Sequence, residues 1–384
     1  MQIALRIISA IGLATLMFGM AVGTSAASDV TGHVYVNANT AGQNTIAAFD
    51  RHSGGSLTAT PGSPFAAGGQ GTGTIIGSQG SLQLSGDGRY LLAADAGSNQ
   101  ISVLRIRPDG MLALAQGSPV DSGGVEPVSI AAHGDLVYVA NEGNKTTGTG
   151  SNYTGFTLNA GGHLRALPGS TVSLPSDAQP GDVLFNGDGT KLVGTRVGTS
   201  QIDSFTVGSD GLLTAAPGSP FAAQGSGPFG SEFRPTNPDQ LFVSNAHNGA
   251  GAGTVSAFRD SADGTLSPIG SSPFADLQTA PCWVEISHDG RFLFTVNTAS
   301  GTISRFSIAP GGKLTLLGST PVAATGGVGA VDARLSPGGR YLYVDESKIG
   351  SVGVFAVHGG SLTELPSSPV KLPAGATPAG VIAS

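Results

Sequence analysis

The chain of 384 residues contains 61 Gly and 23 Pro, and this high content of turn-forming residues argues against a helical protein. Only 11% of its residues are charged while 39% are hydrophobic, a composition that excludes intrinsic disorder. The net charge is −7 and the sequence contains no basic run, so nothing indicates binding to nucleic acid or to an anionic membrane. The single cysteine, Cys282, excludes an intramolecular disulfide and every metal or redox motif that needs several cysteines.

The first 27 residues predict a secretory signal peptide. Arg6 precedes an apolar run over residues 7–22, and small residues follow it up to Ala26 and Ala27. The run is short for a bilayer-spanning helix and ends in an Ala-x-Ala-like cleavage site. We therefore expect residues 28–384 to be the mature protein, secreted or periplasmic, with no membrane association after cleavage.

A short apolar pattern recurs seven times in the rest of the chain. The copies begin at Val34, Leu91, Val137, Leu192, Leu241, Leu293 and Leu342, with a mean spacing of about 51 residues. Several are preceded by an Asp-Gly or Gly-Gly turn, whose glycine supplies the positive φ of a tight hairpin. About ten residues after each copy, a segment with period two predicts a further strand. This period and this repeated order of strands and turns are typical of β-propeller blades.

The ends of the repeats predict the outermost strand of each blade and the way in which the ring closes. Each repeat ends in a Gly-Ser-Pro-like tag, first at residues 62–65, and because proline removes a ladder donor we assign the tag to the outermost strand. The first repeat lacks an innermost strand, and residues 378–383 resemble the innermost strands of later repeats. We expect residues 381–383 to pair with residues 34–36. The predicted fold is an all-β, seven-bladed β-propeller of four-stranded blades, forming a single domain over residues 28–384.

Two segments interrupt the repeat and are expected to be loops between elements. They cover residues 66–80 and 143–152. Within the first, the glycine-rich residues 68–73 lack a lysine and a following helix, so they do not form a phosphate-binding loop. We interpret them as a flexible surface loop.

Polar residues where the predicted second strands end form the candidate site, because these ends meet around the central channel. Arg196 and His247 break the repeat and are candidate catalytic residues. Asp95, Glu142 and Glu346 are candidate ligand-binding residues, and together with Arg196 and His247 they are suited to a small polar ligand or a divalent ion.

Three asparagines occupy the same repeat position and are interpreted as structural caps of the loops; they are Asn141, Asn245 and Asn297. Cys282, on a predicted inner strand, is interpreted as a buried small hydrophobic residue. The histidines show no metal-ligand spacing, so no metal site and no cofactor are expected.

The strands of the type Leu-Tyr-Val-x-Asn, the Asp-Gly-Arg turns and the Gly-Ser-Pro tags resemble the lactonase family of seven-bladed β-propellers over the whole of residues 28–384. That family includes the propeller-type 6-phosphogluconolactonases and the fungal carboxymuconate-lactonizing enzymes. The resemblance implies a seven-bladed fold and chemistry on a lactone, although a shared fold does not by itself fix a function.

The chain departs from the catalytic pattern of that family. Residues 225–235 keep the frame Gly-x-Gly-Pro-Arg-His-x-x-Phe-x-Pro, but its Arg and His positions are Phe229 and Gly230. The glutamate that the family carries after the next strand is replaced by Ala246, and residues 177–182 lack the His-x-His-like element of the preceding blade. Opening a lactone needs a base for water and a group that stabilises the oxyanion, and Phe and Gly side chains supply neither.

Two functions therefore stay open. The first is an exported scaffold that has lost the catalytic residues of the family and binds a small lactone, a carbohydrate or a protein partner. The alternative is a secreted lactone hydrolase or cycloisomerase with a relocated site at Arg196 and His247. The oligomeric state cannot be inferred from the sequence.

Overall fold

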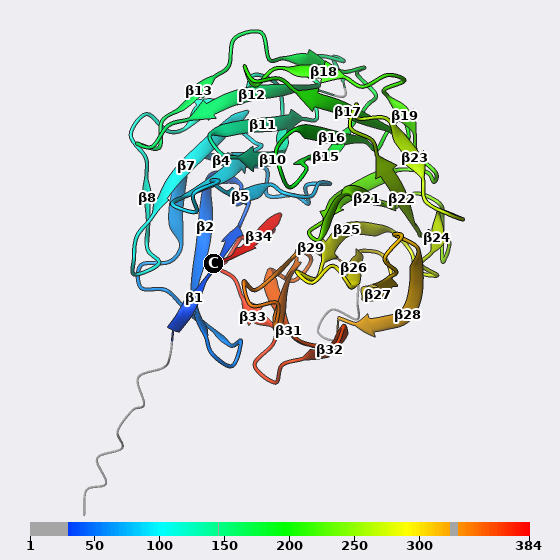
Figure 1. Cartoon of the computed structure of the whole chain (residues 1–384). Helices are drawn as coiled ribbons and strands as arrows, with labels where there is room; N and C mark the ends of the chain where they lie inside the picture. Colours follow the sequence, from blue (N-terminus) through cyan, green and yellow to red (C-terminus); the bar gives the residue numbers. More distant parts are fainter. Residues whose placement is uncertain (1–29, 145, 323–328) are drawn as a thin grey trace, which may run out of the picture.

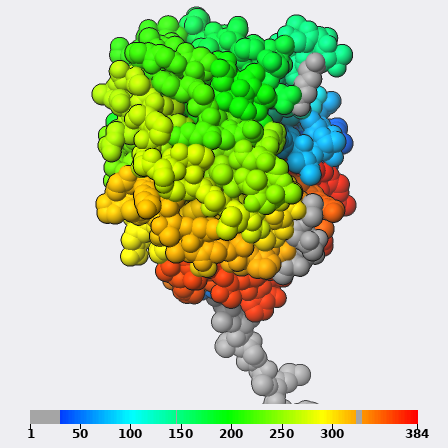
Figure 2. Space-filling model, turned by 90° about the vertical axis from the view of Figure 1, so that its right-hand side faces the viewer, coloured from blue at the N-terminus to red at the C-terminus, as the bar shows by residue number. Residues whose placement is uncertain are grey.

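The computed structural model describes residues 30–144, 146–322 and 329–384, in which every regular element is a β-strand. The predicted signal peptide lies outside these residues. Seven antiparallel sheets are arranged around a central channel as the blades of a β-propeller (Figure 1). Seen edge-on, the successive blades follow one another down the side of the ring (Figure 2). Within the described residues, no helix is long and apolar enough to cross a membrane.

The blades share one order of strands from the channel outward. The innermost strands of blades one to seven are β34 (Gly380–Ala383), β5 (Leu82–Leu84), β10 (Pro127–His133), β15 (Pro180–Phe185), β20 (Pro228–Arg234), β25 (Pro281–Ile286) and β29 (Ala330–Leu335). The second strands are β1 (Val30–Asn37), β6 (Tyr90–Asp95), β11 (Leu136–Asn141), β16 (Lys191–Arg196), β21 (Asn237–Asn245), β26 (Phe292–Asn297) and β30 (Tyr341–Glu346).

The third and outermost strands follow in the same blade order. The third strands are β2 (Gly42–His52), β7 (Gln100–Ile106), β12 (Asn152–Leu158), β17 (Gln201–Val207), β22 (Thr254–Asp260), β27 (Thr302–Ile308) and β31 (Ser351–His358). The outermost strands are β3 (Leu57–Ala59), β8 (Leu112–Leu114), β13 (Leu164–Ala166), β18 (Leu213–Ala215), β23 (Leu266–Pro268), β28 (Leu314–Pro321) and β32 (Ser361–Glu364). Six blades add a further short piece that pairs with the third strand, namely β4 (Phe65–Gly71), β9 (Val120–Asp121), β14 (Val172–Ser173), β19 (Phe221–Ala222), β24 (Phe274–Ala275) and β33 (Val370–Lys371).

The C-terminal strand closes the ring, as the sequence predicts. β34 pairs antiparallel with β1, with Val34 opposite Ala383 and Asn37 opposite Gly380. In Figure 1 the red C-terminal strand lies beside the blue N-terminal blade. The recurring apolar pattern supplies the second strand of every blade, and its residues pack between neighbouring sheets. Val36 of blade one, for example, belongs to the same buried cluster as Tyr343 of blade seven.

The Gly-Ser-Pro tag lies in the expected element in one blade only. In blade six it belongs to the continuous outermost strand β28, whereas in the other six blades it forms the turn that divides the outermost strand into two pieces. At that break, the side chain of the tag serine takes the place of the backbone carbonyl that would otherwise accept a hydrogen bond from the third strand. The Ser63 hydroxyl accepts a hydrogen bond from the Ala48 N–H at 2.9 Å, and the Ser219 hydroxyl accepts one from the Ser204 N–H at 3.0 Å. The serine thus satisfies a third-strand donor that the turn leaves unpaired.

The insertion over residues 66–80 also differs from the expectation. Its first part continues strand β4, so residues 68–71 form part of a sheet and are not a flexible surface loop. Its last part, residues 76–80, enters the channel and is called the plug segment below. The second insertion, residues 143–152, is largely a loop as expected, although Asn152 already begins β12.

The plug segment contacts the inner strands on several sides of the channel. The Ser78 hydroxyl donates to the Val128 carbonyl of blade three at 2.6 Å. The Gln79 side chain donates to the Ser231 carbonyl of blade five at 2.9 Å, and the Trp283 indole of blade six donates to the Ser78 carbonyl at 2.7 Å. Ser78 and Gln79 are both buried. The plug segment therefore links the inner strands of at least three blades across the channel.

Candidate functional site

A cavity of about 410 Å³ opens beside the plug segment, and we call it the mouth cavity. It lies at the end of the channel where the second strands end. Its walls come from the chain before and within the plug segment and from blades three, four and five. The lining residues are Thr74, Ile75, Ile76, Gly77, Glu126, Glu142, Gln179, Val197, Phe229 and His247.

Backbone hydrogen bonds between strand ends hold the polar lining residues in place. The Glu142 N–H donates to the Glu126 carbonyl at 2.9 Å, so the two glutamates of blade three lie next to each other at the cavity. In blade four the Val197 N–H donates to the Gln179 carbonyl at 3.1 Å. His247 is exposed and follows the second strand of blade five. The mouth cavity therefore combines two carboxylates, one carboxamide and one imidazole.

The structure brings together two of the five predicted site residues. Glu142 and His247 line the mouth cavity, whereas Asp95, Arg196 and Glu346 are absent from its lining. These three are the last residues of second strands, and their side chains point into or between blades, toward the third strands. Their roles in ligand binding or catalysis stay predictions.

Arg196 is held by an ion pair inside the ring. Its guanidinium donates to both carboxylate oxygens of Asp203 on the third strand, at 2.5 and 2.6 Å. The Tyr153 hydroxyl of blade three donates to the same carboxylate at 3.0 Å. Only 11% of the Arg196 side chain is exposed. This arrangement joins blades three and four, and the Asp203 carboxylate neutralises the guanidinium charge that would otherwise be available to bind an anionic substrate.

Asp95 and Glu346 are fully buried acids. Asp95 accepts hydrogen bonds from Ser102 at 2.5 Å and from Asn44 of blade one at 2.8 Å, and burial raises its pKa to about 6. Burial likewise raises the pKa of Glu346 to about 7. A Cβ atom at Gly353, on the neighbouring third strand, would lie 2.7 Å from a Glu346 carboxylate oxygen.

The three asparagines of the same repeat position make contacts of the same kind. Their amides donate to third-strand side chains, Asn141 to Asn152 at 2.9 Å, Asn245 to Ser256 at 2.9 Å and Asn297 to Ser304 at 2.8 Å. The three asparagines thus hold the second strand to the third. Glu142, one residue after Asn141, and His247, two residues after Asn245, line the mouth cavity instead.

A cluster of buried charges on the inner strands was missed from the sequence. The carboxyls of Asp182, Glu232, Glu285 and Asp332 surround the Arg334 guanidinium, which lies 3.3 Å from Glu285. Burial raises the pKa of Asp182 to about 7 and that of Asp332 to about 6. We call these residues the channel charge cluster. The sequence did contain a signal for this cluster, because Glu285 and Arg334 are charged residues within segments predicted to be innermost strands. No group of three or more His, Cys, Asp or Glu side chains in the described part of the chain is placed to hold a metal ion.

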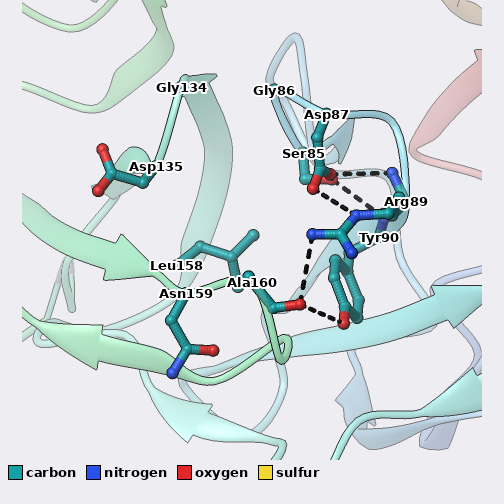
Figure 3. A pocket seen from close by; sticks show the side chains of 10 residues that line it. All are labelled: Ser85, Gly86, Asp87, Arg89, Tyr90, Gly134, Asp135, Leu158, Asn159 and Ala160. Atoms are coloured by element: carbon teal, nitrogen blue, oxygen red, sulfur yellow. Dashed lines mark hydrogen bonds and ion pairs between the residues drawn. The ribbon is translucent and has the colours of Figure 1, made fainter.

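A second cavity, of about 330 Å³, lies at the hairpin turns of blades two and three (Figure 3). The polar groups of its blade-two hairpin are paired with one another or with the Ala160 carbonyl. Arg89 forms an ion pair with Asp87 at 2.6 Å and donates to the Ala160 carbonyl at 3.3 Å, and Tyr90 donates to the same carbonyl at 3.1 Å. These contacts leave less polar surface for a ligand than the mouth cavity does.

The family frame over residues 225–235 meets the plug segment. The Phe229 ring packs edge-on against Trp283, with 5.3 Å between the ring centroids. A Cβ atom at Gly230 would lie 2.1 Å from the Gln79 side-chain oxygen, so the plug segment occupies the space that a side chain at position 230 would need. Cys282, beside Trp283, is buried as expected, and burial raises the pKa of its thiol to about 12.

Comparison with known proteins finds a family model that matches part of the chain and solved structures of similar fold. The family model described as lactonase, 7-bladed beta-propeller matches residues 234–378. No protein of curated function matches the chain. A candidate 6-phosphogluconolactonase of Bacteroides fragilis has 20% sequence identity and a TM-score of 0.72, with 92% of this chain and 98% of that chain covered. The periplasmic gluconolactonase of Pseudomonas aeruginosa has 19% identity and a TM-score of 0.71, with 91% and 98% covered. Residues 234–378 thus match the lactonase family model, in agreement with the resemblance seen in the blade pattern, and the solved structures show the same seven-bladed fold over most of the chain.

Proposed function

We propose that the protein binds a small uncharged sugar or sugar lactone in the mouth cavity. The observation that carries this proposal is the mixed lining of the cavity. Phe229, Val197 and Ile76 offer an apolar wall for the face of a ring, while carboxylate, carboxamide and imidazole groups accept or donate hydrogen bonds to hydroxyls. A cavity of this size accommodates a ligand with a single six-membered ring.

The charges of the lining favour an uncharged ligand over a phosphorylated one. Two lining residues are glutamates, and none of the described lining residues is Arg or Lys. Arg196 already forms an ion pair with Asp203. Among the described lining residues a phosphate group would meet two carboxylates and no Arg or Lys, which is electrostatically unfavourable.

The known relatives and the predicted signal peptide support an exported sugar-lactone-binding protein. A periplasmic gluconolactonase has a similar fold, and its name refers to a lactone without a phosphate group. Export to the periplasm or beyond would also separate the protein from cytosolic sugar phosphates. We infer binding without the catalysis of the family, because Phe229, Gly230 and Ala246 stand at its catalytic positions and Gln79 fills the space beside position 230.

One observation favours a second function, lactone hydrolysis at a relocated site. His247 and Glu142 line the same cavity, and an imidazole near a bound lactone is suited to accept a proton from attacking water. The predicted partner residue Arg196 lies outside this lining, so the second function would depend on His247.

Calorimetric titration of the purified protein with freshly dissolved D-glucono-1,5-lactone, methyl β-D-glucopyranoside and 6-phosphogluconolactone tests the proposal. We expect saturable binding of the two uncharged ligands, at least tenfold weaker binding to Glu142→Ala, and no binding of the phosphorylated lactone. Asp87→Asn, at the second cavity, is the matched control and should bind as the wild type does. Absence of binding by the uncharged ligands, or preferred binding of the phosphorylated one, would refute the proposal.

Lactone hydrolysis followed by titration of the released acid separates the two functions. We expect no hydrolysis of 6-phosphogluconolactone above the uncatalysed rate. Hydrolysis of the uncharged lactone that disappears in His247→Ala would establish the relocated enzyme instead of the binding scaffold.

A further inference from the structure

A third cavity, of about 240 Å³, lies between blades six and seven at the end of the channel opposite the mouth cavity. We call it the lower cavity. It is built like the second cavity, because each is enclosed by the hairpin between the first and second strands of one blade and by two hairpins of the next blade. The two cavities can therefore be compared residue by residue.

In both cavities an arginine is held by its own hairpin. In the lower cavity the Arg291 Nε donates to the Asp289 carboxylate at 2.6 Å, and the guanidinium lies over the Phe292 ring, 5.7 Å from its centroid. The equivalent arginine of the second cavity, Arg89, has the same two distances to its own partners. The hairpin thus orients the terminal nitrogens of the guanidinium in the same way in each cavity.

The two cavities differ in the hairpin that the next blade contributes. In the second cavity five residues connect β12 to β13, and this loop places the Ala160 carbonyl 3.3 Å from a terminal nitrogen of Arg89 and 3.1 Å from the Tyr90 hydroxyl (Figure 3). In the lower cavity only residues 359–360 connect β31 to β32. The shorter connection brings no carbonyl to the arginine.

The terminal nitrogens of Arg291 are consequently unpaired. Among the described residues, Asp289 is the only hydrogen-bond partner of the Arg291 side chain, and it is contacted through Nε. The Gly360 carbonyl accepts a hydrogen bond from Arg305 instead, at 3.4 Å. The N–H groups of Gly359 and Gly360 also donate to no other residue that the structure describes. The lower cavity therefore offers donors and lacks an acceptor for them.

The surroundings of the lower cavity are basic and partly apolar. Arg305 adjoins it through its contact with the hairpin of blade seven, and a Cβ atom at Gly338 of the lining would lie 3.9 Å from Arg340 Nε. Three guanidinium groups thus lie in or beside a cavity with a single carboxylate in its lining, in a chain with a net charge of −7. Phe292 and Val357 supply apolar lining and pack against a hydrophobic core cluster.

We propose that the lower cavity binds the carboxylate of a small molecule that carries a short apolar chain. The free edge of the Arg291 guanidinium has two parallel N–H donors, which match the two oxygens of a carboxylate. The apolar chain lies against Phe292 and Val357. The Asp289 carboxylate beside the guanidinium disfavours a doubly charged phosphate. Because the site lies at the other end of the channel, it does not depend on the ligand proposed for the mouth cavity.

Saturation-transfer difference NMR titrations of the purified protein with butyrate and with butyramide, its uncharged counterpart of similar size, test the proposal. We expect butyrate to bind about tenfold more tightly than butyramide. Arg291→Gln should weaken butyrate binding by about tenfold. The matched variant Arg89→Gln should bind butyrate as the wild type does, because the Ala160 carbonyl already occupies that arginine. Phe292→Tyr introduces the hydroxyl that Tyr90 supplies in the second cavity and should tighten butyrate binding.

Several results would overturn the proposal. They are equal binding of butyrate and butyramide, displacement of butyrate by an equal concentration of inorganic phosphate, unchanged butyrate affinity of Arg291→Gln, and an equal loss of affinity in both arginine variants, which would indicate a general effect of surface charge. The melting temperatures of the two variants should agree, so that a difference in butyrate affinity does not reflect unfolding.

The peptide N-acetyl-Gly-Gly-Val distinguishes two sources of the carboxylate. Tighter binding of this peptide than of butyrate would support the proposal with a protein C-terminus as the ligand, and weaker binding would support it with a free acid.

Discussion

Raising the pH from 5 to 8 should destabilise the protein through the channel charge cluster, and Asp182 provides the sharpest test. Asp182 lies on the innermost strand of blade four and is 2% exposed. Its carboxylate accepts hydrogen bonds from the N–H and hydroxyl of Ser231 at 2.9 and 2.6 Å and from the Ser129 hydroxyl at 3.2 Å. Burial outweighs these bonds and raises the pKa from 3.8 to about 7.

The sign follows from the protons that the two states bind. Between pH 4 and 7 the folded protein holds a proton on Asp182 that the unfolded chain has released, so stability is complete below pH 4 and is lost as the pH rises through 7. The difference between 3.8 and about 7 corresponds to about 4 kcal/mol of unfolding free energy. Of this, about 3 kcal/mol is lost between pH 5 and 8, which for a chain of this length lowers the melting temperature by roughly 4 °C. Asp332, with its pKa raised to about 6, adds a change of the same sign.

Thermal unfolding followed by circular dichroism at pH 5, 6, 7 and 8 measures the effect. Asp182→Asn should flatten the dependence, because the amide keeps an acceptor for Ser231 and offers a donor to Ser129 but has no proton to release. Asp87→Asn is the control: hydrogen bonds from Ser85 and Arg89 lower the Asp87 pKa to about 2, so this group does not titrate in the tested range. A wild-type melting temperature that is constant or rises from pH 5 to 8 would refute the reasoning.

Three further predictions concern the ring itself. Removal of the residues after Pro373 deletes β34, and the lost burial of Val381 and Ile382 alone should lower the unfolding free energy by about 3–6 kcal/mol; an unchanged denaturation midpoint would contradict the closure. Ser219→Ala leaves the Ser204 N–H unpaired and should cost about 1–2 kcal/mol in urea unfolding, whereas the exposed Ser209→Ala should be neutral. Arg196→Ala leaves the buried Asp203 carboxylate without its ion-pair partner and should lower the unfolding free energy by about 3 kcal/mol without changing ligand affinity. A loss of ligand affinity at unchanged stability would support the predicted role of Arg196 in the site.

The fold could be predicted because the same packing problem is solved seven times. One apolar strand per blade, hairpin turns with glycine and a first repeat without an inner strand determine the ring and its closure. The tag was predicted correctly for blade six but not for the other six blades, because proline indicates a sheet edge but does not distinguish a strand from a turn that interrupts one. The serine of the tag is understandable only once its contact with the third strand is known.

The site could be predicted only in part. Glu142 and His247 reach the mouth cavity, but Asp95, Arg196 and Glu346, which occupy a repeat position one residue before that of Glu142 and two before that of His247, lie within or between blades. A position along a strand can be counted from the sequence, whereas the face on which a side chain emerges at the frayed end of a strand cannot. The plug segment could not be predicted because its partners lie far away in the sequence: Gln79 and Ser231 are separated by 152 positions.

The closure of the ring also sets the order in which the protein can be completed during synthesis. Blades two to seven are each built from consecutive residues, so they can form hairpin by hairpin as the chain emerges. Blade one contains the first strand to be made and the last, and His33 and Ser384, 351 positions apart, are joined by hydrogen bonds. The edge of β1 therefore stays open until residues 380–384 have been made, and until then this edge can pair with strands of other chains. The Ser384 carbonyl accepts hydrogen bonds from the His33 N–H and the Arg51 side chain, so Ser384 is held against β1. A tag fused after Ser384 therefore needs a spacer to reach solvent without disturbing these bonds.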